Sequence, residues 1–209
     1  MLHAVLSFAA VAGLLTLVPG LDTALVLRAA LSSSRRCAFA TSIGIGCGTL
    51  VWGAAAALGV SVLLTASEVA YTGLRIAGAI YLAWMGIGMV RAAFRRPATI
   101  FAAAADDSPR TLGGAWARGL GTNLLNPKIG VFYVAMLPQF LPDGVPHLLM
   151  GCTLAMVHNL EGMLWFTVII CAASFAKTWL NRDSVRRATD AITGTVVVGF
   201  GVKLAISNE

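Results

Sequence analysis

Long stretches without a charged residue constrain this sequence more than any other feature. Residues 1–21 contain no Asp, Glu, Lys or Arg, and the same is true of residues 37–67. Four further apolar runs contain one charge each, and they cover residues 69–90, 119–142, 144–176 and 191–206. Because a helix needs about 20 apolar residues to cross a bilayer, the pattern predicts an all-α polytopic membrane protein with six transmembrane helices.

The composition agrees with a membrane environment. Hydrophobic residues make up 58% of the 209 residues and charged residues only 11%, whereas about 25% is usual in soluble domains. The net charge of +6 comes from basic residues in the short stretches between apolar runs. That placement is typical of a topology signal and not of a nucleic-acid interface. The four cysteines form no CxxC pair, so we expect neither a disulfide framework nor a zinc site.

The basic residues also predict an orientation. Twelve of the 15 lie in the connectors that would share one side of a six-helix protein. By the positive-inside rule this side is cytoplasmic, so both termini are expected on the opposite side of the membrane. No Lys or Arg precedes the first apolar run, which favours a retained helix over a cleaved signal peptide.

The order of the runs predicts one membrane domain, residues 1–209, built from two three-helix units. Residues 1–90 would form the first unit, residues 91–118 a cytoplasmic loop, and residues 119–209 the second unit. Short similarities support a repeat: Gly86–Val90 resembles Gly199–Lys203, and a proline lies beside a charge near both Asp22 and Lys128. Units of three helices would be inverted relative to each other, a recurring plan in transporters (3+3 inverted repeat).

Asp22 and Lys128 are the first candidates for chemistry. A charge within a membrane span costs at least about 2.5 kcal/mol at its centre, and a neighbouring proline breaks the helix and frees polar backbone groups. In an amino-acid zwitterion, Asp22 could pair with the ammonium group. Lys128, or a half-helix N-terminus near Gly20, could pair with the carboxylate. The alternative is that both charges lie at interfacial depth, where they cap helix ends or pair with each other.

Two polar groups accompany these charges. Asn123 and Asn126 precede Lys128 in an apolar run, where amides either bind a ligand or bridge helices. His158 and Glu161 are three residues apart on one predicted helix face, which suggests either a proton relay or a buried structural pair. One His and one carboxylate are too few ligands for a metal site, and no cofactor motif is present.

The residues around these positions resemble the LysE/RhtB family of amino-acid exporters. Residues 17–28 resemble the first-helix signature, in which Leu21 replaces the second proline of Pro-Gly-Pro-Asp. Residues 123–128 resemble the motif of the fourth span, and residues 137–140 its following tail; residues 43–52 and 77–86 also fit. The resemblance implies a homodimeric six-helix exporter of the bacterial inner membrane, coupled to protons or to the membrane potential. In that membrane the predicted orientation makes both termini periplasmic. The resemblance assigns the transport motif to Pro19, Gly20, Asp22, Asn123, Asn126, Pro127 and Lys128.

The favoured function is therefore secondary export of amino acids or related small polar metabolites, without enzymatic activity or a cofactor. A cation exporter of the same superfamily is an alternative, although such a site would be expected to hold more carboxylates. A membrane enzyme is disfavoured because no nucleophile–base arrangement is visible. A membrane scaffold would tolerate neutral replacements at Asp22 and Lys128.

Overall fold

The structure, a computed structural model, describes residues 1–66, 111–142 and 144–173, with isolated positions between 69 and 91 and between 184 and 202. Every regular element within these ranges is a helix. The predicted third and sixth spans, at 69–90 and 191–206, lie largely outside the described residues, as do Arg75 and Lys203. The proposed inverted repeat therefore stays a prediction.

The first predicted span is a broken helix. Helix α1 covers Leu2–Leu17 and helix α2 covers Leu21–Ser32, and their axes differ by 55°. Pro19 lies in the break, where its ring and missing N–H cannot continue α1. Helical structure continues beyond the uncharged run of residues 1–21, because α2 extends through Arg28. An acidic residue in the first turn, here Asp22, does not end a helix, since the N-terminal dipole stabilises it.

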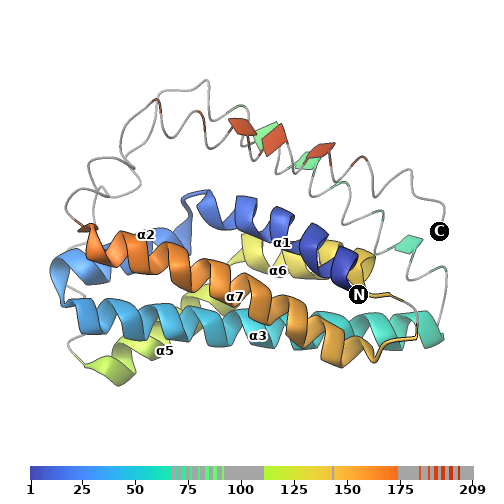
Figure 1. Ribbon diagram of the computed structural model, residues 1–209, viewed down its shortest axis with the longest axis horizontal. Helices are drawn as coiled ribbons and strands as arrows, with labels where there is room; N and C mark the ends of the chain where they lie inside the picture. Colours follow the sequence, from blue (N-terminus) through green and yellow to red (C-terminus); the bar gives the residue numbers. More distant parts are fainter. Residues whose placement is uncertain are drawn as a thin grey trace.

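Two long helices form the frame of the molecule. Helix α3 covers Arg35–Ala66 and helix α7 covers His147–Cys171, and they lie side by side along the longest axis (Figure 1). Ser34 caps α3, since its Oγ accepts a hydrogen bond of 3.1 Å from the Cys37 N–H. Among the described helices, α7 and the Arg35–Gly59 part of α3 are each long and apolar enough to cross a membrane, and the bent α1–α2 pair is a third candidate.

The predicted fourth span is also interrupted. Helix α5 covers Leu112–Leu124, helix α6 covers Pro127–Met136, and the 3₁₀ helix η1 covers Leu137–Phe140. Helix α5 begins inside the stretch 91–118 that the sequence predicts as a loop. Thr111 caps it by accepting a hydrogen bond of 3.2 Å from the Gly114 N–H. The break between α5 and α6 falls just before Pro127, which occupies the first position of α6, where a proline is favoured.

Helix α3 approaches α5 so closely that side chains are excluded at two points. A Cβ atom built on Gly44 would collide with the backbone carbonyl of Trp116, and one built on Gly119 with that of Thr41. Backbone atoms cannot move aside as the end of a flexible side chain can. Only glycine therefore fits at these crossings.

The contact between α3 and α7 follows the same principle. A Cβ on Gly53 would lie 2.5 Å from the Cβ of Ala155, and a Cβ on Gly151 would lie 2.5 Å from the Cβ of Ala57. Small residues at such positions let membrane helices pack through van der Waals contact. We refer to the four residues at these two contacts, Gly44, Gly53, Gly119 and Gly151, as the glycine seam.

Two apolar clusters fill the space between the helices. The larger one contains the aromatic rings of Phe8, Phe132, Tyr133 and Phe140. The smaller one joins Val26 and Leu27 of α2 to the N-terminal half of α3 and to three residues of α7, namely Phe166, Ile169 and Ile170. Each cluster links a half of the broken first span to the long helices.

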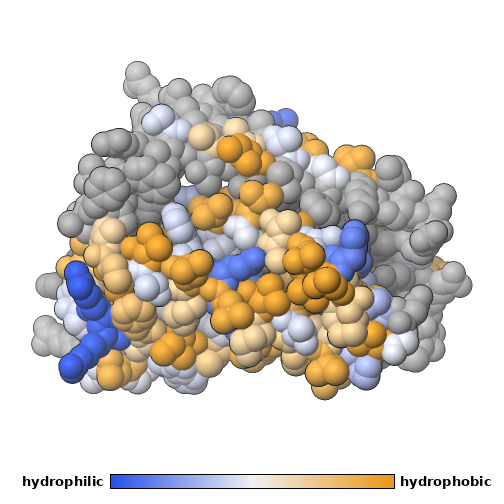
Figure 2. Space-filling view, in the orientation of Figure 1, coloured by the Kyte–Doolittle hydropathy of each residue, from blue (hydrophilic) through white to orange (hydrophobic). Residues whose placement is uncertain are grey.

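The outer surface is apolar as well. In Figure 2 hydrophobic side chains cover much of the coloured face over α1, α3 and α7. On α7, Leu160, Leu164 and Val168 are exposed, and their spacing of four residues places them on one helix face. A continuous exposed apolar strip is expected where a helix faces lipid.

Candidate transport site at two helix breaks

Lys128 closes the broken end of α1. In a continuous helix the Leu15 carbonyl would accept from the N–H of residue 19, but Pro19 has none. The Lys128 Nζ donates to the Leu15 carbonyl at 3.0 Å and to the Val18 carbonyl at 3.1 Å. A cation is favoured here because carbonyl groups give a helix C-terminus partial negative charge. Lys128 thus performs the capping role that the sequence left open as an alternative.

Lys128 lies at the start of α6, directly after the break between α5 and α6. Asn126 precedes the first turn of α6, and its Oδ1 accepts a hydrogen bond of 3.1 Å from the Lys128 N–H. Lys128 is the second residue of α6, as Asp22 is the second residue of α2. The two breaks therefore carry opposite charges at the same position of their second half-helix.

Asp22 is buried at the N-terminus of α2, with 8% of its surface exposed. The Asn123 Nδ2 donates to its Oδ2 at 2.9 Å. Its other oxygen, Oδ1, is buried and has no hydrogen-bond partner among the described residues. In a membrane, leaving such an acceptor unsatisfied is costly, so this atom is suited to a ligand that donates hydrogen bonds.

Asn123 is held in place from three sides. It is fully buried, and a Cβ on Gly48 would lie 2.5 Å from its Oδ1, so glycine is required opposite the amide. The indole Nε1 of Trp52 donates to the Asn123 carbonyl at 3.4 Å, and the Trp52 ring packs on Gly130 of α6. These contacts fix the amide that orients Asp22.

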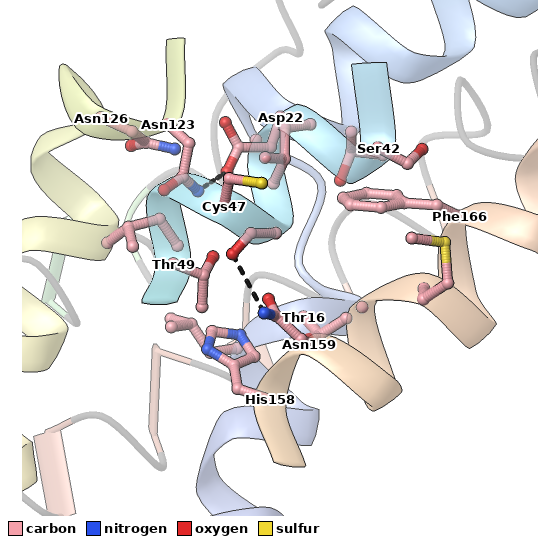
Figure 3. A pocket seen from close by; sticks show the side chains of 18 of the residues that line it. Thr16, Asp22, Ser42, Cys47, Thr49, Asn123, Asn126, His158, Asn159 and Phe166 are labelled. Carbon is pink, nitrogen blue, oxygen red and sulfur yellow. Dashed lines mark hydrogen bonds between the residues drawn. The ribbon is translucent and has the colours of Figure 1, made fainter. Parts of the chain in front are cut away.

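A cavity of about 240 Å³ opens between these elements. Both motif charges and both motif amides line it, together with Gly20 and residues of α1, α3 and α7. Figure 3 shows Asn123 turned toward Asp22 on one side of this space, and His158 and Phe166 on other sides. Three of the residues that line the cavity have a buried oxygen without a hydrogen-bond partner in the described part of the chain, namely Thr16 Oγ1, Asp22 Oδ1 and Asn123 Oδ1.

The predicted pair on α7 contacts two different neighbours. His158 lines the cavity, and its Nδ1 lies 3.0 Å from the Tyr133 hydroxyl, with the two rings stacked at 5.9 Å. Glu161 instead lies against α1, where its carboxylate is 3.5 Å from the position of a Cβ on Gly13. Its Oε2 is buried without a partner within the described ranges. The relay between His158 and Glu161 stays a prediction.

Several cavity residues were not singled out from the sequence. Thr16, Ser42, Cys47 and Thr49 line the cavity, but an isolated hydroxyl or thiol in an apolar run is common in membrane helices. Tyr133, the partner of His158, lies one and a half turns beyond Lys128 in α6, a spacing that gave no signal. Asn159, which follows His158 in α7, donates to the Gly46 carbonyl at 3.0 Å and joins α7 to α3.

A cavity between two broken, oppositely charged helices within an apolar helical bundle is typical of polytopic membrane transport proteins. Within the ranges described, no three His, Cys, Asp or Glu side chains lie together as metal ligands would. The comparison with known proteins identifies the family to which this chain belongs. The chain belongs to the LysE type translocator family, which is matched over residues 11–208.

Individual relatives cover nearly the whole chain. The threonine efflux protein of Escherichia coli (strain K12) is 33% identical over 191 residues, which is 90% of this chain and 91% of that protein. The leucine efflux protein of Enterobacter sp. (strain 638) is 26% identical over 91% of this chain and 90% of its own length. The Bacillus subtilis (strain 168) membrane protein YrhP is 29% identical over 99% of this chain and 100% of its own length. No solved structure matches the chain.

Proposed function

We propose that this protein is a secondary active exporter that moves amino acids, or closely related small polar metabolites, outward across the bacterial inner membrane. The observation that supports the proposal is buried Asp22, which lines the cavity together with Lys128 and whose Oδ1 has no hydrogen-bond partner among the described residues. The similarity to proteins named threonine efflux protein and leucine efflux protein supports the same class of substrate.

An amino-acid zwitterion matches this site in charge. Its ammonium group has three N–H donors, and the cavity holds acceptors without partners in the described residues, at Thr16, Asp22 and Asn123. Its carboxylate would be attracted by the positive charge of Lys128. Because Lys128 also caps α1, an arriving carboxylate would compete with the α1 carbonyls for the same ammonium. Substrate binding would then loosen the end of α1, which is the kind of coupling that alternating access requires.

Export from intact cells tests the proposal. Cells that overproduce the protein are loaded with a panel of amino acids as dipeptides, and the external medium is followed by mass spectrometry. We expect at least one amino acid to appear outside, and its export rate to fall about tenfold or more in Asp22→Asn, because a hydrogen bond to a charged group is worth about 1.5–3 kcal/mol. Thr153→Val is the matched control: this hydroxyl bonds its own helix, at the Leu149 carbonyl, and does not line the cavity.

Two results would contradict the proposal. Equal export by Asp22→Asn and wild type, at matched abundance in the membrane, would remove Asp22 from the transport site. A flat panel from correctly inserted wild-type protein would exclude these amino acids and favour a different metabolite or a cation.

Protons are the proposed coupling ion, and Glu161 is the proposed carrier. Its Oε2 is buried without a partner in the described chain, and a carboxyl group in such a place is less costly when protonated. Among the described residues, Tyr133 of α6 interacts electrostatically with Glu161, and His158 precedes Glu161 by three residues in α7. In proteoliposomes we expect Glu161→Gln to abolish export driven by a pH gradient while substrate exchange continues. Loss of both activities, or of neither, would argue against this role.

The orientation and assembly belong to the same proposal. The basic connectors support periplasmic termini, and reporters fused to each end should both be active in the periplasm. A cytoplasmic C-terminus would contradict six crossings. A homodimer is expected, and native mass spectrometry in detergent would detect it.

A further inference from the structure

The charges of the cavity limit the substrates that it can accept. Among the described residues that line it, only Asp22 and Lys128 carry a formal charge. The ammonium and carboxylate of a zwitterion match these two groups. A third charge, on the substrate's own side chain, would find no opposite charge in this lining, and burying an uncompensated charge is costly.

Part of the cavity wall is apolar, between polar residues that include Thr16, Thr49 and His158. Helix α7 contributes Met163 and Phe166, and α3 contributes Ile43 and Ile45. Phe166 lies on the opposite side of the cavity from Asn123 in Figure 3. Ser42 also lines the cavity, but its hydroxyl donates to the Ala38 carbonyl of its own helix at 3.0 Å, so its proton is already used.

The size of the space adds a second limit. Its volume of about 240 Å³ is below the range of about 300–1,000 Å³ that is typical for drug-sized ligands, so it suits one small molecule. Methionine adapts to ligands of different shape because it is unbranched and polarizable. The wall around Met163 can therefore accommodate several short hydrocarbon chains.

We propose that Met163 and Phe166 form the subsite for the substrate's side chain, and that the protein selects amino acids with neutral, aliphatic side chains over cationic ones. This inference rests on the proposed function, since it assumes that the α-ammonium and α-carboxylate groups bind near Asp22 and Lys128. The two α7 residues are specificity-determining because they contact the part of the substrate that varies.

Direct binding to the purified full-length protein in lipid nanodiscs tests the selectivity. Leucine, valine, glycine, lysine and arginine are compared by calorimetry or competition. We expect leucine and valine to bind about tenfold or more tightly than lysine or arginine. If lysine bound as tightly as leucine, the proposed selectivity would be wrong, although the proposed export of amino acids could still be correct. Absence of binding by every amino acid would instead contradict the proposed function.

Variants at the subsite separate specificity from general damage. Met163→Ala should weaken leucine binding by about fivefold to tenfold, since it removes apolar contacts with the side chain of leucine, and it should leave glycine binding unchanged. Glycine has no side chain, so it serves as the internal control. Equal losses for leucine and glycine would show that Met163 acts only on the structure and would overturn its assignment.

A charge introduced at the same position gives a gain of function. Met163→Glu should raise the affinity for lysine relative to that for leucine by about tenfold or more, because the new carboxylate supplies a charge opposite to that of the lysine side chain. Met163→Gln has almost the same shape without the charge and should not. Phe166→Leu, which keeps an apolar side chain, provides a second position in case the glutamate variant does not fold, and it should shift preference toward bulkier aliphatic substrates without changing glycine binding. An unchanged preference in both Met163→Glu and Phe166→Leu would refute the subsite.

Discussion

The glycine seam and the two helix breaks hold helices together in opposite ways. At the seam, backbone meets backbone, as where Gly119 faces the Thr41 carbonyl. At the breaks, individual side chains make the connection, as where Lys128 donates to two carbonyls of α1. Contact of the first kind has one arrangement, because no atom can move aside. Contact of the second kind consists of hydrogen bonds that a ligand with the same groups could replace.

This difference divides the described helices into a rigid frame and a part whose contacts a bound substrate could replace. Helices α3, α5 and α7 are joined by glycine contacts, whereas α1 is joined to α6 largely through Lys128 and the apolar cluster around Phe8. We therefore expect substitutions at the seam to affect folding first, and substitutions at the breaks to affect transport first.

The largest effect is expected at the seam. Gly119→Ala adds a Cβ that would collide with the Thr41 carbonyl, so α3 and α5 must separate. Overpacking of a close contact costs about 1–3 kcal/mol and sometimes more. We expect folded protein to be largely lost, as measured by size-exclusion chromatography of a fluorescent fusion in detergent.

Gly121→Ala is the matched control for this substitution. It lies on the same helix, and a Cβ there would have no neighbour within 4 Å among the residues that the structure describes. Because alanine is the better helix former by about 1 kcal/mol, Gly121→Ala should fold at least as well as wild type. Similar behaviour of the two variants would show that the seam is not a rigid contact.

An intermediate effect is expected at Lys128. Lys128→Met removes two hydrogen bonds from the α1 carbonyls, and an unsatisfied buried acceptor costs about 1–3 kcal/mol. The melting temperature should fall and export should be lost, although membrane insertion is expected to continue. Asp22→Asn should lose export without lowering the melting temperature, since an amide oxygen can still accept the bond from Asn123. Equal melting temperatures for wild type and Lys128→Met would contradict the capping role.

The smallest effect is expected from Leu21→Pro, which restores the proline of the motif that this sequence resembles. Leu21 is the first residue of α2, where a proline needs no hydrogen-bond donor. The preceding Gly20 is already extended, with φ −146° and ψ −163°, as a residue before proline should be. Stability should change by no more than about 1 kcal/mol, and export should remain. A large loss in a thermal melt would mean that the break depends on Leu21 in particular.

The sequence was most informative where the cause is local. Both breaks were predicted correctly, because a proline affects the chain within one turn of its position. The extent of the helix after the first break was not predicted. The uncharged run ends before Asp22, whereas α2 continues through Ser32, because an acidic residue is tolerated at a helix N-terminus. The partners of the site residues could not be predicted either. Asp22 and Asn123 are 101 residues apart and Lys128 and Leu15 are 113 apart, so their pairing depends on the packing of whole helices.

The contact between Trp52 and the Asn123 carbonyl gives the protein an optical property. The Trp52 indole donates to the Asn123 backbone carbonyl, and the Asn123 side chain donates to the Asp22 carboxylate. Asn123 therefore connects the indole to the carboxylate that is proposed to bind the substrate. Indole fluorescence depends on the electric field and on hydrogen bonding at Nε1. Binding of a substrate at Asp22 should therefore change the emission wavelength or the fluorescence intensity of Trp52. A ligand could then be followed without a label, in a chain whose other tryptophans have been replaced.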